Sequence, residues 1–443
     1  MTLEPDILYG LSREEYDAIP AMNGSLLKEM TVSPGKLDWR RRNPRETTPN
    51  MLRGTAIELL ACEPAKFPHR FTTAPTRPEE LPEDFIVEPP LLEDMPEHWV
   101  LPPQDRADLP EHFVDPPPDW NPRTSVGKEW KAEQLAEGRV IVRPTDHEDG
   151  MLRPGCQARK DWHRWVTASG KIVLDLTDFD ATGRLVLDST TGRKWAAEMK
   201  DAGHVVVRPT DWNEYGFRTD TGPGQAWKAH MERHGVHVFN ATDMGYVRGA
   251  AAALLEHPVT AALIAAGEKQ VAVVWPDLIT GQWCKGLVDL YIPEATQHLI
   301  DVLIDDAEKD EDGAVLEPWM IPKLGEPMVP DIKTTAVELN DDSAEKLAGD
   351  LYWYWQGAMY LDGLTVASGR PHRWFADLVV EQLPVHRVET YIMHPDDPEG
   401  ELALGRAEYQ AALQSYSYCE EDGTWPTSSR RLKRLRLPRW KWR

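Results

Sequence analysis

The sequence predicts an α/β protein in which two insertions interrupt one folded domain. Three observations predict this class. Apolar β runs alternate with helical patterns after residue 268, thirteen prolines crowd into residues 74–122, and a unit of 32–33 residues recurs four times within residues 123–247. We therefore expect residues 1–73 and 248–443 to build one folded domain around a proline-rich segment and a set of tandem α/β repeats.

Composition narrows the class of protein further. The chain has 443 residues, 41% of them hydrophobic, and contains no apolar run of 18 residues, so no membrane span is expected. The start "MTLEPDILYG" lacks the basic and apolar regions of a signal peptide. The four cysteines form no C-x-x-C pair, which disfavours a zinc ribbon, an iron–sulfur cluster or a disulfide framework. A cytoplasmic protein is predicted.

Charge is segregated along the chain. The net charge is −24, of which residues 74–122 contribute −11 and residues 301–317 contribute −7. The C-terminal run 430–443 carries eight Arg or Lys and no acid. The acidic balance alone would disfavour nucleic acid, but a basic end of this kind could contact phosphates, and the alternative is a solvated tail.

The first 73 residues carry helix signals. "LSREEYDAIP" places Ser12 as an N-cap and Glu15 in the capping-box position, and "NGSLLKEM" reads as a second helix start. Residues 52–64 show an apolar helical pattern in which Gly54 and Ala56 are small enough for close packing.

The proline-rich segment repeats a short unit with a spacing of 14. "LPEDF", "MPEHW" and "LPEHF" begin at residues 81, 95 and 109. So many prolines exclude a regular helix or a central strand. We expect an extended, polyproline-like segment whose aromatic anchors dock either on the protein's own surface or on a partner.

The tandem repeats share three features at fixed offsets. Each copy has a tryptophan, a glycine eight residues later and the aspartate of a Thr-Asp pair sixteen residues later. The tryptophans are Trp130, Trp162, Trp195 and Trp227. Each copy therefore predicts a helix, a glycine C-cap, a short β run and a polar turn or N-cap. Core anchoring by the tryptophans is favoured over base stacking, and the first three copies are expected to be buried mainly against one another, so that residues 131–227 could be excised.

The catalytic half of the chain reads as strands and helices in turn. "KQVAVVWPD" and "QWCKGLVDLYIP" predict two strands joined by a turn, and an acidic insertion at 301–328 precedes the strand "VPDIKTTAV". One helix is expected over 342–364, followed by the strands "RWFADLVVEQ" and "HRVETYIM" and a last helix.

Acidic and basic side chains gather in this half. Alternation along a strand places Asp331 and Lys333 on one face, which is either a weak surface ion pair or a metal ligand beside a basic group. Asp289, on the preceding strand, supplies a second carboxylate, and two such groups suit Mg²⁺ or Mn²⁺. Gln356 and Tyr360 lie one helical turn apart on one face.

These motifs together resemble the PD-(D/E)xK nucleases. G-x(2)-D, D-x-K and Q-x(3)-Y occur in that family's order, and "RGTAIELLACEPAKF", "CKGLVDLY", "DIKTTA" and "YWYWQGAMYLDGL" resemble blocks of its exonuclease VIII (RecE-type) phage branch. The resemblance covers residues 8–73 and 225–440 and implies a restriction-endonuclease-like core, which is a mixed central sheet flanked by helices. It also implies roles for seven residues: metal ligands Asp289, Asp331, the Ile332 carbonyl and Glu58; the catalytic Lys333; and the active-site or DNA-positioning residues Gln356 and Tyr360.

The resemblance also implies a reaction. It points to a Mg²⁺-dependent (or Mn²⁺-dependent) exonuclease acting 5′→3′ on ends of double-stranded DNA, with a single-strand annealing protein as partner and a ring-like homo-oligomer as assembly. A first rival is another nuclease of the same fold, either an endonuclease or a CRISPR-associated or RecB-like processing enzyme. A second rival is a non-catalytic phage interaction protein on a nuclease scaffold.

Overall fold

The computed structural model describes residues 3–148 and 151–428 and divides the chain into two compact units. The first unit comprises Met1–Thr73 and Gly235–Arg443, and the second comprises Ala74–His234. The sequence placed its boundaries after residues 73, 122 and 247, whereas the structure places the proline-rich segment and most of the repeats in one unit. The basic run 430–443 lies outside the described residues.

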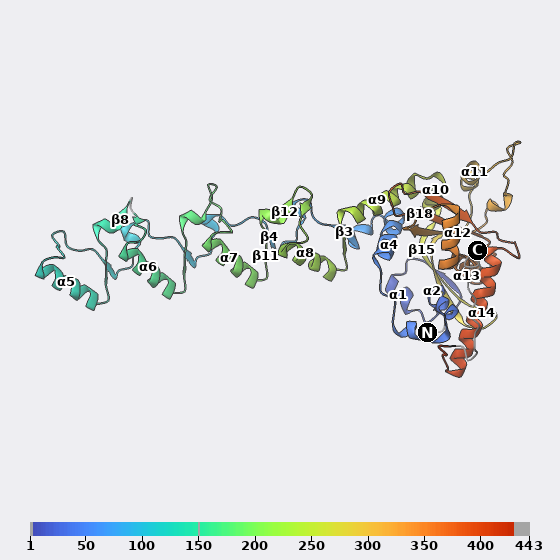
Figure 1. Cartoon of the computed structure of the whole chain (residues 1–443), viewed down its shortest axis with the longest axis horizontal. Helices are drawn as coiled ribbons and strands as arrows, with labels where there is room; N and C mark the ends of the chain where they lie inside the picture. The colour runs from blue at the N-terminus through green and yellow to red at the C-terminus, as the bar shows by residue number, and fades with distance from the viewer. Residues whose placement is uncertain (1–2, 149–150, 429–443) are drawn as a thin grey trace, which may run out of the picture. The chain divides into compact units, whose positions relative to one another are not determined.

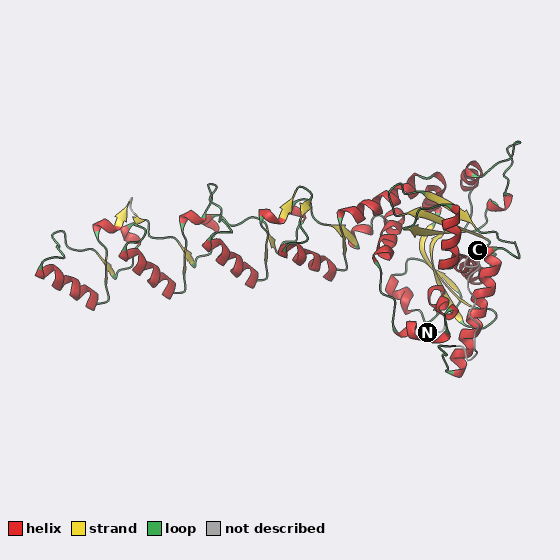
Figure 2. Cartoon of the chain, in the orientation of Figure 1, coloured by secondary structure: helices red, strands yellow, loops and turns green. Residues whose placement is uncertain are grey.

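Two sheets form the centre of the first unit (Figure 2). One has the order β1 (Asp6–Leu8), β15 (Glu268–Pro276), β16 (Trp283–Tyr291), β2 (Met22–Asn23), and the other has the order β17 (Met328–Thr335), β18 (Trp374–Glu381), β19 (Val388–Ile392). Parallel and antiparallel pairs occur in both. The sheets meet at a single antiparallel bridge between Ile292 and Met328, beyond which β16 and β17 separate.

Helices cover the sheets in two layers (Figure 1). One core cluster holds the apolar faces of α13 (Trp353–Ser368) and α14 (Glu401–Asp422), and the other holds those of α4 (Pro49–Cys62), α9 (Ala241–Glu256), α10 (Pro258–Ala266) and α11 (Gln297–Asp306). Phe375 and Val379 of β18 belong to the first cluster, whereas Leu378 and Val380 belong to the second. A strand buried on both faces explains its continuous apolar sequence. The predicted mixed α/β class is confirmed.

Local signals at the N-terminus are also confirmed. Ser12 and Glu15 form the expected capping box at the start of α1 (Arg13–Ala18), and Asn23 caps α2 (Gly24–Leu27), which is followed by α3 (Pro34–Arg42). Gly54 allows α4 to approach β17, because a Cβ there would lie 2.7 Å from Thr334 Oγ1. The absence of a side chain at Gly54 therefore lets α4 pack closely against the strand that contains the D-x-K motif.

The single helix expected over 342–364 is wrong. The chain forms α12 (Asp341–Leu351) and α13, separated by Tyr352 in the left-handed region with φ 60°. Contacts from a distant segment occupy the break: Lys28 Nζ donates to Leu351 O at 2.8 Å, and Tyr352 Oη donates to Thr31 Oγ1 at 3.3 Å. Such tertiary contacts have no counterpart in a local periodic pattern. The acidic insertion likewise begins within a helix, because α11 runs to Asp306.

The second unit repeats one motif, as expected. Its helices are α5 (Ser125–Ala136), α6 (Gln157–Ala168), α7 (Thr190–Asp201) and α8 (Gly222–Arg233). The glycines that follow them have positive φ, with values of 72°, 80°, 92° and 75° at Gly138, Gly170, Gly203 and Gly235. Each glycine therefore ends its helix in a conformation that other residues avoid. In the first three copies the Thr-Asp pair closes a 3₁₀ turn.

The proline-rich segment pairs with these repeats. Its strands β4 (Phe85–Ile86), β5 (Trp99–Val100) and β6 (Phe113–Val114) form parallel ladders with β11 (Val205–Val206), β10 (Ile172–Val173) and β7 (Val140–Ile141) respectively. The pairing runs in reverse order along the chain: the first proline-rich motif pairs with the third repeat, the second with the second, and the third with the first. In the first unit, β3 (Phe71–Thr73) and β14 (His237–Phe239) pair in the same way. The segment's aromatic anchors dock on the protein's own repeats.

Burial of the aromatic anchors shows how each repeat is stabilised. Phe85, Trp99 and Phe113 are at most 6% exposed. Trp162 packs in a cluster with Phe113 and with Val142, which follows the strand of the preceding copy. Core anchoring is thus confirmed for Trp162, Trp195 and Trp227, whereas Trp130 is half-buried and packs against Trp120. Adjacent copies do pack together, but the expected burial of copy against copy is incomplete, because each of the first three copies also pairs with a proline-rich unit. Each 14-residue copy of the proline-rich segment therefore pairs with one 32–33-residue copy of the tandem repeat.

This pairing changes which excision should leave a folded protein. We expect replacement of residues 74–234 by a Gly/Ser linker of about 15 residues to leave the first unit soluble, because β3 and β14 stay paired and parallel strands need a crossover of about a dozen residues. Removal of residues 131–227 alone should cause aggregation, since it deletes β7, β10 and β11 and uncovers the proline-rich aromatics. Light scattering and circular dichroism of both variants would check this. An unfolded linker variant would show that the second unit supports the first.

Among residues 3–148 and 151–428, no single helix is long and apolar enough to cross a bilayer. The helices α9 and α10 pass such a test only when taken together, and they are bent by 89° where they meet.

Candidate active site

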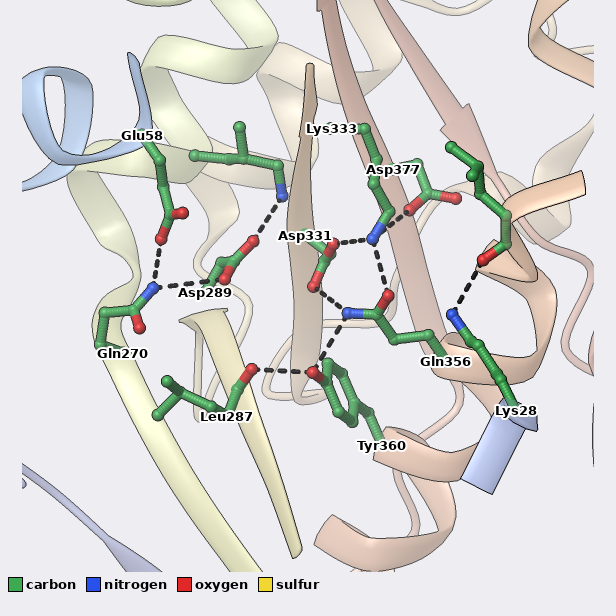
Figure 3. A network of polar contacts seen from close by, with 12 residues as sticks. Lys28, Glu58, Gln270, Leu287, Asp289, Asp331, Lys333, Gln356, Tyr360 and Asp377 are labelled. Carbon is green, nitrogen blue, oxygen red and sulfur yellow. Dashed lines mark hydrogen bonds and ion pairs between the residues drawn. The ribbon is translucent and has the colours of Figure 1, made fainter. Parts of the chain in front are cut away.

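Six of the residues that the sequence predicted for the active site lie close together in two neighbouring sets of polar contacts (Figure 3). They come from α4, β16, β17 and α13, and comprise Glu58, Asp289, Asp331, Lys333, Gln356 and Tyr360. The network lies where β16 and β17 separate, so backbone pairing gives way to side-chain contacts.

Asp331 and Lys333 are a buried pair. Their side chains are 1% and 11% exposed, and Lys333 Nζ donates to Asp331 Oδ2. Gln356 joins them, since its Oε1 accepts from Lys333 at 3.0 Å and its Nε2 donates to Asp331 Oδ1 at 3.0 Å. The shared strand face is confirmed, and the surface ion pair is wrong. Both partners are fixed in orientation by one amide group.

Tyr360 connects the helix to β16. Its hydroxyl donates to Leu287 O at 2.8 Å and accepts from Gln356 Nε2 at 3.1 Å. Gly286 provides the space for the ring, because a Cβ at that position would lie 2.7 Å from Tyr360 Cε1. Gly286 of the G-x(2)-D motif and Tyr360 of the Q-x(3)-Y motif therefore pack directly against each other.

Asp289 occupies the gap between the two strands. Its Oδ2 accepts from the Ile332 backbone N–H at 3.0 Å, so the carboxylate takes the place of a strand partner. Its Oδ1 accepts from Gln270 Nε2 at 3.3 Å, and the same Nε2 donates to Glu58. One amide N–H₂ group therefore bridges the two carboxylates (Figure 3).

The sequence did not identify three other residues of the site. Gln270 lies opposite Asp289 in the β15–β16 hairpin, which its predicted register could have revealed. Asp377 pairs with Asp331 across β17 and β18, lies 3.7 Å from Lys333 and is 1% exposed. An acid inside the apolar run "WFADLVVE" was a signal for it. Lys28 reaches the site from a distant helix end, and no sequence pattern predicts that.

Burial and like charge shift the pKa values of these groups. Burial, with Asp331 nearby, raises the pKa of Glu58 to about 7 and holds the pKa of Asp289 well above its ordinary value. Burial also raises the pKa of Asp377 to about 7. For Lys333, burial lowers the pKa, but the carboxylates of Asp331 and Asp377 outweigh it and the net shift is upward. Lys333 is therefore a cation held among acids.

The donor set suits a hard divalent cation. In the described part of the chain, no three His, Cys, Asp or Glu side chains converge as a ready-made metal cluster. Asp331 is turned toward Lys333 and Gln356, while Asp289 and Glu58 share a partially positive N–H₂ group where a cation would relieve their repulsion. By their chemistry Glu58 and Asp289 suit such an ion, and Asp331 would join them by giving up a contact with Lys333 or Gln356.

The raised pKa of Glu58 gives a pH-dependent stability. In EDTA, stability should fall as pH rises from 4.5 through about 7, because the folded protein holds a proton that the unfolded chain releases in that range. The loss contributed by this group is at most about 3 kcal/mol. Thermal unfolding from pH 4.5 to 8 would measure it, with Glu58→Gln expected to flatten the slope and the exposed Glu214→Gln to leave it unchanged. Equal slopes for all three proteins would contradict the shift.

Comparisons with known proteins give little beyond this geometry. No protein-family model matches the chain, and no curated protein matches it. A solved structure of a candidate exonuclease from Eubacterium rectale is similar over 50% of this chain and 73% of that chain, with 11% sequence identity and a TM-score of 0.28. A likeness that weak carries no argument, so any function has to be argued from the side chains described above.

Proposed function

We propose that the chain is a Mg²⁺-dependent nuclease that degrades double-stranded DNA from its ends. The observation that carries the proposal is the polar network itself: Lys333 and Asp331 on one strand, hydrogen-bonded to Gln356 and Tyr360 and adjacent to the acid pair Asp289 and Glu58. The motif resemblance in the sequence supports the same reaction. Each residue of that motif set has a contact here with another of its members or with a neighbouring strand.

The residues divide the chemical work. Asp289, Asp331 and Glu58 would hold the cation, with the Ile332 carbonyl as a further oxygen donor, and the ion would supply Lewis-acid activation of the phosphodiester and of water. Lys333 would neutralise charge that develops on the scissile phosphate. Gln356 fixes the Lys333 ammonium through its Oε1, and Tyr360 fixes Gln356. The mechanism thus depends on a lysine held rigidly beside the ligand oxygens.

Further features of the proposal rest on the sequence resemblance alone. They are 5′→3′ polarity, a single-strand annealing protein as partner and a ring-like homo-oligomer. An endonuclease or a processing enzyme would use the same side chains. A non-catalytic scaffold is disfavoured, because the buried Asp331 and Asp377 beside the half-buried Glu58, Asp289 and Lys333 are costly to a fold that has no use for them.

Substrate ends test the proposal. Full-length protein with Mg²⁺ is incubated with a linear duplex and with the same duplex as a covalently closed circle. We expect the linear DNA to shorten from its ends and the circle to stay intact. Cleavage of both would replace the exonuclease with an endonuclease, and cleavage of neither would contradict the proposed function.

A further inference from the structure

Gln270 has an unusual backbone for its place in the fold. Among the described residues, the non-glycine residues with positive φ are Gln270, Tyr352, Val385 and His386. Three of them lie in connections, but Gln270 lies inside β15, between the ladder pairs of Lys269 and Val271, with φ 53°. A left-handed residue within a strand is costly and persists only where its surroundings fix it.

Side-chain contacts show what fixes it. Gln270 Nε2 donates both to Glu58 and to Asp289 Oδ1, so the strained residue delivers its amide between two acids of the site. Both side-chain hydrogen bonds of Gln270 use Nε2, and among the described residues none is donated to its Oε1. Rotation of the terminal amide by half a turn would place Oε1 where Nε2 now lies, between Glu58 and Asp289. This rotation gives up the two hydrogen bonds of Nε2 and no hydrogen bond of Oε1.

We propose that Gln270 is a ligand of the cation. In the metal-free protein its N–H₂ group bridges Glu58 and Asp289, and when a divalent cation binds between these carboxylates the amide turns and coordinates the ion through Oε1. An amide oxygen is a hard donor of the kind that Mg²⁺ and Mn²⁺ accept beside carboxylates. Gln356 cannot take this role, because both ends of its amide are engaged by Lys333, Asp331 and Tyr360.

The inference rests on the proposed function, since it assigns a ligand to the cation of that site. Binding is therefore measured apart from activity. Isothermal titration calorimetry of Mn²⁺ into EDTA-stripped full-length protein compares wild type with Gln270→Leu, Gln270→Gly and Gln270→Glu, and Asp289→Asn defines binding elsewhere on this acidic chain. Glycine accepts the positive φ freely, so Gln270→Gly keeps the test valid if Gln270→Leu does not fold.

The variants have distinct expected results. Loss of the amide in Gln270→Leu or Gln270→Gly should weaken Mn²⁺ binding about 10-fold or more. Gln270→Glu places a carboxylate oxygen at the same point and should bind Mn²⁺ as tightly as wild type or more tightly. If Gln270→Gly binds as tightly as wild type, the inference is overturned and the proposed function stands. If wild type itself binds no Mn²⁺ at the Asp289-dependent site, both fall.

Discussion

Replacing Asp331 by asparagine is expected to lower the rate of duplex cleavage about 10³-fold or more, equivalent to about 4 kcal/mol of transition-state stabilisation. The carboxylate is 1% exposed and contacts Lys333 and Gln356, so the amide removes a ligand charge with almost no change of shape. Single-turnover digestion of an end-labelled duplex would measure the rate. The exposed Asp305→Asn on α11 is the matched control and should cleave like wild type.

A folded Asp331→Asn protein that cleaves at the wild-type rate would remove Asp331 from the site. Circular dichroism and thermal unfolding accompany the assay, because a buried carboxylate that is paired with a lysine also contributes to stability. Asp289→Asn should give a loss of the same order, since Asp289 occupies the gap between β16 and β17.

Replacing Lys333 by alanine is expected to lower the single-turnover rate about 10²-fold or more, with little change in affinity for duplex DNA. The ammonium is held by Asp331 and Gln356, so it is oriented before substrate arrives. The variant should also unfold at a lower temperature in EDTA than in Mg²⁺, because Asp331 and Asp377 lose the ammonium group that lies closest to both of them.

Rate and affinity distinguish two roles for Lys333. Lys200→Ala, an exposed change on α7, controls for the loss of one positive charge. Weaker binding with an unchanged single-turnover rate would mean that Lys333 only clamps phosphate.

Local patterns in the sequence predicted part of this site. Alternation placed Asp331 with Lys333, and helical spacing placed Gln356 with Tyr360, because each pair lies on one element whose period is fixed. Two contacts between distant elements were not predicted by such local reasoning. Asp377 enters through strand pairing, and the break at Tyr352 depends on Lys28 and Thr31 from the other end of the chain.

The second unit shows the same division. Both of its repeats were visible in the sequence, but their pairing was not, because one period is 14 residues and the other is 32–33. Equal numbers of copies in the two repeats would have indicated the pairing. Phe71 begins the series that continues at Phe85, Trp99 and Phe113, which gives four aromatic anchors for four tryptophan copies.

Cation dependence of cleavage tests the central claim most directly. The measurement is the initial rate of shortening of an end-labelled linear duplex by EDTA-stripped full-length protein as Mg²⁺ is added. The site described here requires no cleavage in EDTA and a saturable rise in rate with Mg²⁺, because the proposed role of Glu58 and Asp289 is to hold the ion that activates the phosphodiester and water. Cleavage at full rate in EDTA, or none at any Mg²⁺ concentration, would contradict the account.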